Sequence, residues 1–298
     1  MSEAPRARAG GTYALGDRTV ARIGYGAMQL GALPGRAEPS EEAAVAVLRR
    51  AVELGVNHID TAQFYGDGRA NALIRLALHP YPDELALASK VGAVSAGRGL
   101  RPAQRPEELR AQVEANLASL GTERLDLVNL RRLDLGRMRA EGEQIVDLDS
   151  QLAELADLRS EGKIGAIGLS TVSAEQLRQG LPVGIACVQN AYSVIGRSDE
   201  DLLEICREYE IAWVPYFPLG SAFSGLPKVT DAAAVVTIAE TLDVAPAQVG
   251  LAWLLAHGAN ILLIPGTSQV VHLEQNVGAA DVRLDGRAMA TLDALASA

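Results

Sequence analysis

The run Ile164-Gly165-Ala166-Ile167-Gly168-Leu169 decides the fold class, because it is short and apolar at every position. A strand with one exposed face alternates apolar and polar residues, whereas a parallel strand covered on both faces is apolar throughout. Amphipathic segments flank this run, and the pattern of a short aliphatic strand followed by a helix repeats along the chain. The run therefore predicts a parallel α/β sheet.

Eight such strand candidates lie along the chain, with helical segments between them. The strands are expected at residues 21–27, 57–62, 85–91, 125–130, 164–169, 185–189, 212–217 and 261–264. The helices are expected at residues 40–54, 69–78, 106–120, 150–160, 174–179, 198–209 and 231–242. An open doubly wound sheet is the alternative, but no Gly-x-Gly-x-x-Gly turn follows an early strand and opens a helix. We therefore predict a (β/α)8 TIM barrel.

Three segments lie outside this repeat. Residues 12–22 are predicted to form an N-terminal hairpin that turns at Gly16 and Asp17. Residues 246–257 and 287–296 are predicted to be extra C-terminal helices. No linker, low-complexity tract or block of charge divides the chain, so residues 1–298 are expected to form a single domain.

The composition excludes several classes of protein. Lys and Arg number 27 against 37 Asp and Glu, which gives a formal charge of −10 and argues against nucleic acid as a partner. Hydrophobic residues make up 48 % of the chain, enough for a sizeable core. Cys187 and Cys206 are too few for a disulfide framework, which points to a reducing compartment. No apolar run has the length of a signal region or a membrane helix, so we expect a cytoplasmic protein without a membrane partner.

Three polar side chains at the predicted ends of the second and third strands form a candidate proton-transfer group. They are Asp60, Tyr65 and Lys90. In such a barrel, catalytic groups lie at the carboxyl ends of the strands. A lysine ammonium beside a phenol is expected to lower the pKa of the phenol from about 10, and a carboxylate keeps the lysine charged. The alternatives are that Asp60 caps a helix and that Lys90 is a solvated strand end.

The string Asp60-Thr61-Ala62-x-x-Tyr65-Gly66, together with Lys90, resembles the aldo-keto reductases. The resemblance covers essentially the whole chain, because further family motifs follow in the correct order. These are Gly168-Leu169-Ser170, Gln189-Asn190-x-Tyr192, Pro218-Leu219-Gly220 and Ile264-Pro265-Gly266-Thr267-Ser268. The resemblance implies reduction of a small aldehyde or ketone to an alcohol, with Tyr65 as the general acid and Lys90 and Asp60 tuning it.

One catalytic position departs from the family pattern. The fourth catalytic residue of the family is usually a histidine on the fourth strand, and here that position is Arg131. An arginine stays charged and cannot shuttle a proton, but it can donate hydrogen bonds to an oxygen or pair with an anionic group of the substrate. The alternative is that Arg131 pairs with Asp60 or points away.

The same resemblance implies NADPH or NADP as cofactor, in preference to NADH. Ser170 and Gln189 would hold the nicotinamide amide, and Tyr216 would stack on the ring. The remaining expected cofactor residues are Gly26, Met28, Phe217, Pro218, Leu219, Gly220, Ser221, Gly266, Thr267, Ser268, His272, Gln275 and Asn276. No metal is expected, since the four histidines are scattered without ligand spacing. One of them, His58, is predicted to be a core histidine whose hydrogen bonds are satisfied.

Within the family, the chain resembles the branch of bacterial pyridoxal reductases. The residues that carry this resemblance include Tyr65, Gly66, Asn71 and the Val128-Asn129-Leu130-Arg131 string. It implies interconversion of pyridoxal and pyridoxine, and the phenol of pyridoxal is a group that Arg131 could pair. Nine arginines against six acids from residue 97 to 140 give this segment a charge of +3, which indicates a basic mouth or merely a solvated face.

Three other functions remain open from the sequence. The chain could be a ketoreductase of secondary metabolism, or a regulatory subunit that binds the cofactor with little turnover. It could also be a Schiff-base enzyme in which Lys90 is the nucleophile.

Overall fold

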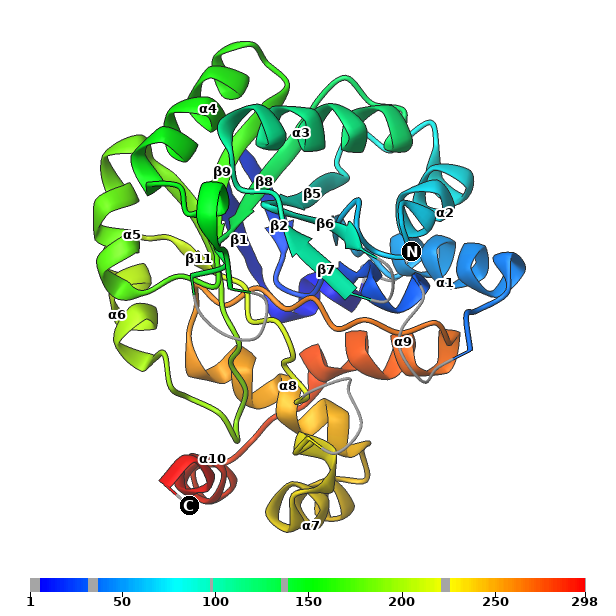
Figure 1. Ribbon diagram of the computed structural model, residues 1–298. Coiled ribbons are helices and arrows are strands. Elements are labelled where there is room, and N and C mark those ends of the chain that lie inside the picture. Colours follow the sequence, from blue (N-terminus) through cyan, green and yellow to red (C-terminus); the bar gives the residue numbers. More distant parts are fainter. Residues whose placement is uncertain (1–5, 32–36, 97–98, 135–138, 221–225, 298) are drawn as a thin grey trace.

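The computed structural model describes residues 6–31, 37–96, 99–134, 139–220 and 226–297. Seven parallel strands form one curled sheet in the order β11-β10-β9-β8-β5-β4-β3, and helices surround it (Figure 1). The strands are β3 (Tyr25–Gly26), β4 (His58–Asp60), β5 (Ala86–Val91), β8 (Leu125–Arg131), β9 (Ile164–Ser170), β10 (Ile185–Gln189) and β11 (Ala212–Trp213). Each corresponds to a predicted strand, and the apolar run at residues 164–169 lies in β9, between β8 and β10.

An eighth strand segment at residues 261–264 closes the sheet into a barrel. It makes parallel bridges from Ile261 to Trp213 on one side and from Leu263 to Ile23 on the other. The N–H of Leu263 donates to the carbonyl of Arg22 at 2.8 Å, and the N–H of Gly24 donates to the carbonyl of Leu263 at 2.8 Å. The predicted (β/α)8 barrel is therefore confirmed, although its last pairings are isolated bridges rather than a regular ladder.

The outer helices also match the prediction closely. Ser40 begins α1, because its hydroxyl accepts a hydrogen bond from the N–H of Ala43 at 3.2 Å. The fourth helix begins two residues earlier than predicted, since Asp147 rather than a serine caps it. The helices are α1 (Glu41–Glu53), α2 (Arg69–Leu78), α3 (Pro106–Leu120), α4 (Leu148–Ser160), α5 (Ala174–Gly180), α6 (Glu200–Glu208), α7 (Ala233–Leu242), α8 (Pro246–His257), α9 (Val270–Gly278) and α10 (Gly286–Asp293).

Two elements were not predicted. Helix α9 follows the eighth strand and packs against α8 and α1, which completes the ring of helices. A hairpin of β6 (Ala93–Ala96) and β7 (Gly99–Pro102) follows β5 at the carboxyl end of the barrel. Its two strands are Ala-Val-Ser-Ala and Gly-Leu-Arg-Pro, which are too short to show the alternation that marks a strand in sequence.

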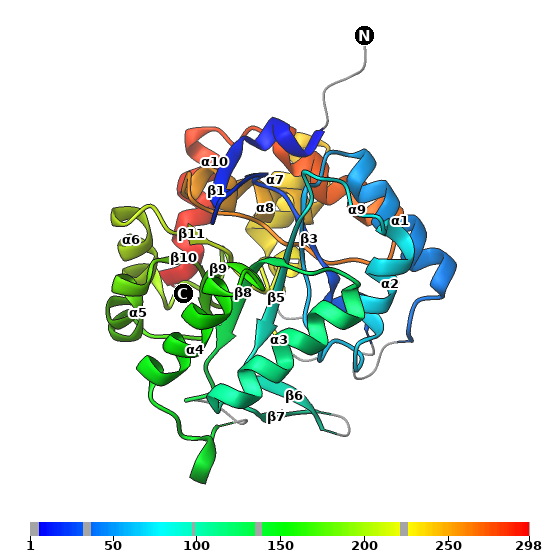
Figure 2. The same cartoon turned by 90° about the horizontal axis from the view of Figure 1, so that it is seen from above.

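The predicted N-terminal hairpin closes the opposite end of the barrel. Strands β1 (Thr12–Leu15) and β2 (Arg18–Ala21) pair around Gly16, which has a left-handed φ of +64°. Leu15 and Val20 of this hairpin join the apolar cluster inside the barrel, whose other members are Ala86, Ala88, Leu127, Ala166, Cys187, Ala212, Val214, Leu262 and Ile264. Figure 2 shows the β1–β2 and β6–β7 hairpins at opposite ends of the molecule.

The core contains one polar side chain that the sequence prediction described wrongly. His58 is buried inside the barrel as expected, but neither ring nitrogen has a hydrogen-bond partner among the described residues. Its imidazole occupies the space above Gly24, where an added Cβ would lie 2.1 Å from Nε2. Burial lowers the pKa of His58 to about 4, so the ring is neutral.

Within the described ranges, no single helix is long and apolar enough to cross a membrane. Helices α7 and α8 meet those criteria only as a pair, and the two are bent by 97° relative to each other.

Arg22 holds the closure of the barrel from outside. Its guanidinium donates to the carbonyl of Ile261 at 3.1 Å and to that of Leu255 at 2.8 Å, and it also reaches Gly258. These carbonyls belong to the end of α8 and the start of the eighth strand. Arg22 makes no ion pair with any acid in the described part of the chain, so its charge is met by backbone oxygens alone.

We predict that Arg22→Met lowers the free energy of unfolding by about 3 kcal/mol, because it leaves several carbonyls without their charged donor. Denaturant unfolding followed by circular dichroism measures this loss. Arg287→Met is the matched control, since Arg287 is exposed on α10 and its loss should change stability by less than about 0.5 kcal/mol. Equal effects of the two substitutions would show that Arg22 does not hold the closure.

Candidate active site

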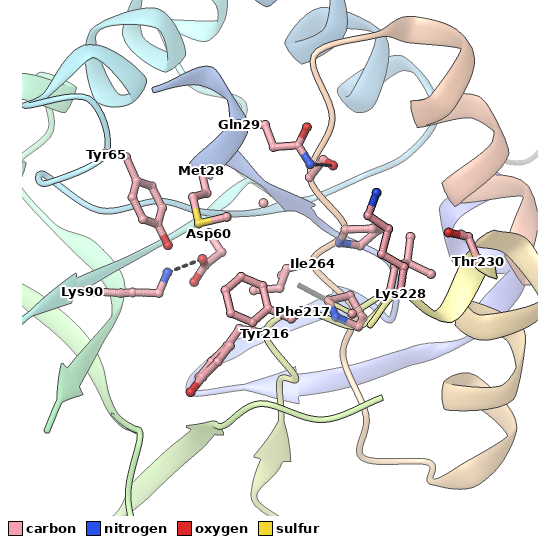
Figure 3. A pocket seen from close by; sticks show the side chains of 16 residues that line it. Met28, Gln29, Asp60, Tyr65, Lys90, Tyr216, Phe217, Lys228, Thr230 and Ile264 are labelled. Atoms are coloured by element: carbon pink, nitrogen blue, oxygen red, sulfur yellow. Dashed lines mark hydrogen bonds and ion pairs between the residues drawn. The ribbon is translucent and has the colours of Figure 1, made fainter. Parts of the chain in front are cut away.

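A cavity of about 230 Å³ opens at the carboxyl ends of the strands. Its lining comes from both ends of the chain, because barrel closure brings the first strand beside the last. The lining residues are Gly26, Met28, Gln29, Asp60, Tyr65, Lys90, Tyr216, Phe217, Pro218, Leu219, Gly220, Lys228, Thr230, Ile264, Pro265 and Gly266 (Figure 3). Eleven of these sixteen were expected from the sequence, and they include three of the four expected catalytic residues.

The predicted carboxylate, ammonium and phenol meet at one end of this cavity. Asp60 ends β4 and Lys90 lies on β5, and the two form an ion pair in which both are almost fully buried, at 2 % and 5 % exposure. Lys90 Nζ also donates to the carbonyl of Thr61 at 3.2 Å. The same ammonium lies 5.1 Å from the centre of the Tyr65 ring, and Figure 3 shows the Tyr65 hydroxyl directed toward it.

The sequence predicts a lowered pKa for the Tyr65 phenol, whereas in the structure this pKa is raised. Burial raises the pKa of this phenol, and the opposing charges of Lys90 and Arg131 only partly offset the effect. Burial acts to lower the pKa of Lys90, but Asp60 and Tyr65 together outweigh it and the net direction is upward. Tyr65 is therefore a neutral phenol, able to donate a proton, beside a charged ammonium.

A buried amide completes this group. Gln189, at the end of β10, donates from Nε2 to the second oxygen of Asp60 at 2.7 Å. Its Oε1 atom is buried and has no hydrogen-bond partner among the described residues. Ser170 ends the neighbouring β9 and is register-paired with Gln189. The structure thus places both predicted amide-binding residues beside the catalytic group.

A buried polar network supports the loop that carries Tyr65. Thr61 donates from its hydroxyl to Asn71 at 2.8 Å, and Asn71 donates in turn to Asn116 at 3.0 Å. Ser89, one residue before Lys90, donates to the same Asn116 oxygen at 2.6 Å. Asn116 therefore joins the ends of β4 and β5 from behind, on the helix side of the sheet.

The far end of the cavity carries groups suited to phosphate and was only partly expected. Lys228 lines it together with Thr230 and Gln29, and no described acid pairs with Lys228. Neither Lys228 nor Thr230 was predicted. Both follow the predicted cofactor loop at residues 218–221 by fewer than ten positions, and this closeness in sequence could have identified them.

Other predicted cofactor residues lie beside the cavity rather than in its lining. Thr267 is buried and precedes α9, where its hydroxyl accepts from the N–H of Gln269 at 3.1 Å. Ser268 adjoins it, His272 is exposed on α9 and Asn276 is buried there. Gln275 lines a separate cavity between α7 and α8, and Ser221 lies outside the described residues. The expected roles of these six residues remain predictions.

Arg131 ends β8 beside Ser170 and does not pair with Asp60. Of the seven described arginines in the basic segment at residues 97–140, four form ion pairs with acids, which reduces the positive charge that the segment presents. These four are Arg105, Arg110, Arg124 and Arg132.

Two residues beside the site have left-handed backbone conformations that their side chains disfavour. Thr171, directly after Ser170, has a φ of +59°, and Phe217 in the cavity wall has a φ of +57°. Such conformations cost roughly 1–3 kcal/mol and concentrate at functional sites.

Comparison with known proteins agrees with this geometry. The model of the aldo/keto reductase family matches residues 22–297. Pyridoxine 4-dehydrogenase of Escherichia coli is 42 % identical over 95 % of this chain and 98 % of its own length. An uncharacterized oxidoreductase of Schizosaccharomyces pombe is 36 % identical over 98 % of this chain and 92 % of its own.

A solved structure shows the same fold. The crystal structure of an aldo/keto reductase from Klebsiella pneumoniae in complex with NADP and acetate superimposes with a TM-score of 0.77. It is 26 % identical in sequence, and the match covers 95 % of this chain and 94 % of the other. The chain is therefore an oxidoreductase and belongs to the aldo/keto reductase family.

Proposed function

We propose that the chain is an NADPH-dependent carbonyl reductase that interconverts pyridoxal and pyridoxine. The observation that carries this proposal is the neutral Tyr65 phenol beside the buried Lys90–Asp60 ion pair at the end of the cavity. The identity of 42 % to pyridoxine 4-dehydrogenase supports the choice of substrate. The NADP in the Klebsiella pneumoniae structure supports the choice of cofactor.

The residues of the cavity fit a nicotinamide dinucleotide. Tyr216 offers an aromatic side chain for the nicotinamide ring, and the unpartnered Oε1 of Gln189 offers an acceptor for its amide. Lys228 offers a cation for a phosphate at the other end. Bound NADPH would supply the hydride that reduces the carbonyl carbon.

The protein's own residues supply the proton. Tyr65 donates a hydrogen bond to the carbonyl oxygen and then its proton, so that the carbonyl becomes an alcohol. The Lys90 ammonium stabilises the phenolate that remains until solvent returns the proton. Asp60 keeps Lys90 charged, and Gln189 holds Asp60 in place.

Two of the alternative functions are less well supported. Asp60 holds Lys90 as an ammonium, whereas a Schiff-base nucleophile must lose that proton. A regulatory subunit without turnover would not need the complete proton-donating group that Asp60, Lys90 and Tyr65 form.

The substrate assignment predicts that pyridoxal supports steady oxidation of NADPH, and that NADH supports much slower turnover. Loss of NADPH absorbance, measured against a panel of aldehydes and ketones, tests both. Turnover of ketones without turnover of pyridoxal would overturn the substrate and favour the ketoreductase alternative. Tight binding of NADPH with no turnover of any carbonyl would overturn the reductase.

Replacement of the proton donor tests the mechanism. Tyr65→Phe should lower kcat by about a thousand-fold, because it removes the acid and keeps the ring. NADPH binding, followed by fluorescence, should be retained. Tyr13→Phe at the closed end of the barrel is the control and should keep full activity. A Tyr65→Phe enzyme with normal kcat would exclude Tyr65 as the acid.

Lys228→Gln tests the phosphate end of the cavity. We expect the Kd for NADPH to rise about ten-fold, since a charge-assisted hydrogen bond is lost. An equal rise for NADH would place Lys228 at the pyrophosphate, and a rise for NADPH alone would place it at the 2′-phosphate. Lys163→Gln, which removes a lysine paired with Glu114 and Glu161 on the outer surface, is the control. Unchanged binding of both cofactors to Lys228→Gln would exclude Lys228 from the site.

A further inference from the structure

Arg131 and its neighbour Arg132 have opposite environments. Arg132 is buried, makes two hydrogen bonds with the Asp134 carboxylate at 2.8 and 2.9 Å, and donates to the carbonyl of Val146 at 3.0 Å. Arg131 is partly exposed, and its guanidinium makes no hydrogen bond or ion pair with any described residue. The Nε atom of Arg131 is shielded from solvent and still has no partner. Arg132 therefore has a structural counter-ion, whereas Arg131 lacks one within the described chain.

The backbone beneath Arg131 is held firmly. Its carbonyl accepts a hydrogen bond from Gln104 Nε2 at 2.9 Å, and Gln151 in turn donates to Gln104 at 3.0 Å. Gly92, at the end of β5, passes so close that an added Cβ would lie 2.4 Å from the same carbonyl. The base of the side chain is thus anchored while its charged end is free to bind.

The charged end of Arg131 lies beside the proposed proton donor. Its guanidinium carbon is 5.9 Å from the centre of the Phe64 ring, and that ring meets the Tyr65 ring edge to face at 5.3 Å. Phe64 belongs to an apolar cluster outside the cofactor cavity, whose other buried members are Ala62, Ala93, Leu133 and Ala140. This cluster is buried by the protein itself, so the group beside the proton donor that a ligand can reach is the partly exposed Arg131 guanidinium.

We propose that Arg131 binds an anionic oxygen of the substrate, so that the preferred substrates are aromatic carbonyl compounds with a phenolate or carboxylate near the carbonyl. This inference rests on the proposed carbonyl reduction and narrows its substrate class. A partly exposed guanidinium over an aromatic ring offers two parallel donors to such an oxygen. Because an arginine gives up no proton, Arg131 selects the substrate while Tyr65 alone supplies the proton.

A pair of matched aldehydes tests the inference. 5-Nitrosalicylaldehyde is a phenolate at neutral pH, and 2-methoxy-5-nitrobenzaldehyde has the same ring without the charge. We expect the wild-type kcat/KM to favour the phenolate at least ten-fold, with alcohol formation measured by chromatography. In Arg131→Gln this ratio should fall close to one, whatever happens to the absolute rates.

Arg101→Gln is the matched control, because Arg101 is an exposed cation on the β6–β7 hairpin. It should leave the ratio of the two substrates unchanged. A ratio that persists in Arg131→Gln, or one that falls equally in both variants, would overturn a direct contact between Arg131 and the anion.

Equilibrium binding separates this inference from the proposed reaction. Salicylate has an anionic carboxylate on the aromatic ring but no reducible carbonyl, and calorimetric titration with and without NADP gives its Kd. Arg131→Gln should weaken salicylate binding at least ten-fold. If neither aldehyde is reduced by the wild type, the proposed function fails, and the salicylate titration still decides the anion site. Equal binding of salicylate by wild type and Arg131→Gln would overturn it.

Discussion

The buried ion pair between Lys90 and Asp60 is the interaction on which the site depends. Moving two charges into a protein interior costs several kcal/mol for each ion, and their attraction repays this only with good geometry and further hydrogen bonds. The chain provides these bonds from Gln189 to Asp60 and from Lys90 to the carbonyl of Thr61. Apolar residues of the inner cluster fill the barrel below the pair. Such an arrangement contributes little to stability and much to the chemistry.

The surroundings of the pair show how a rigid scaffold positions it. Asn116 joins the ends of two strands from behind, and the strained backbone at Thr171 and Phe217 borders the same site. These features are costly by themselves, and the packed barrel outside the site compensates for them. The packed part and the site lie at opposite ends of the strands. The β1–β2 hairpin closes one end of the barrel with Leu15 and Val20, and the candidate site lies at the other end.

Much of this architecture could be predicted from the sequence, for physical reasons. Covered parallel strands have apolar runs, and helix caps such as Ser40 mark the helices that follow. The meeting of Asp60, Lys90 and Tyr65 in one site was predictable because they lie at or just after strand ends, two of them in a specific string. Helix α9 was not predicted, because the segment before it and several of its own residues were assigned to the cofactor site rather than to a helix. The β6–β7 hairpin lacks alternation, and Lys228 is a single exposed residue without a local pattern.

The direction of the Tyr65 pKa could not be predicted, because it depends on burial that only the folded barrel reveals. The closure by Arg22 was equally unpredictable, since Arg22 joins backbone carbonyls more than two hundred residues away.

The closure of the barrel by its last strand also has a consequence for synthesis on the ribosome. The proton-donating residues come early in the chain, but Ile264 and Gly266 of the same cavity come late. The cavity is therefore complete only after the last strand has left the ribosome, so no incomplete copy of the chain carries the whole site.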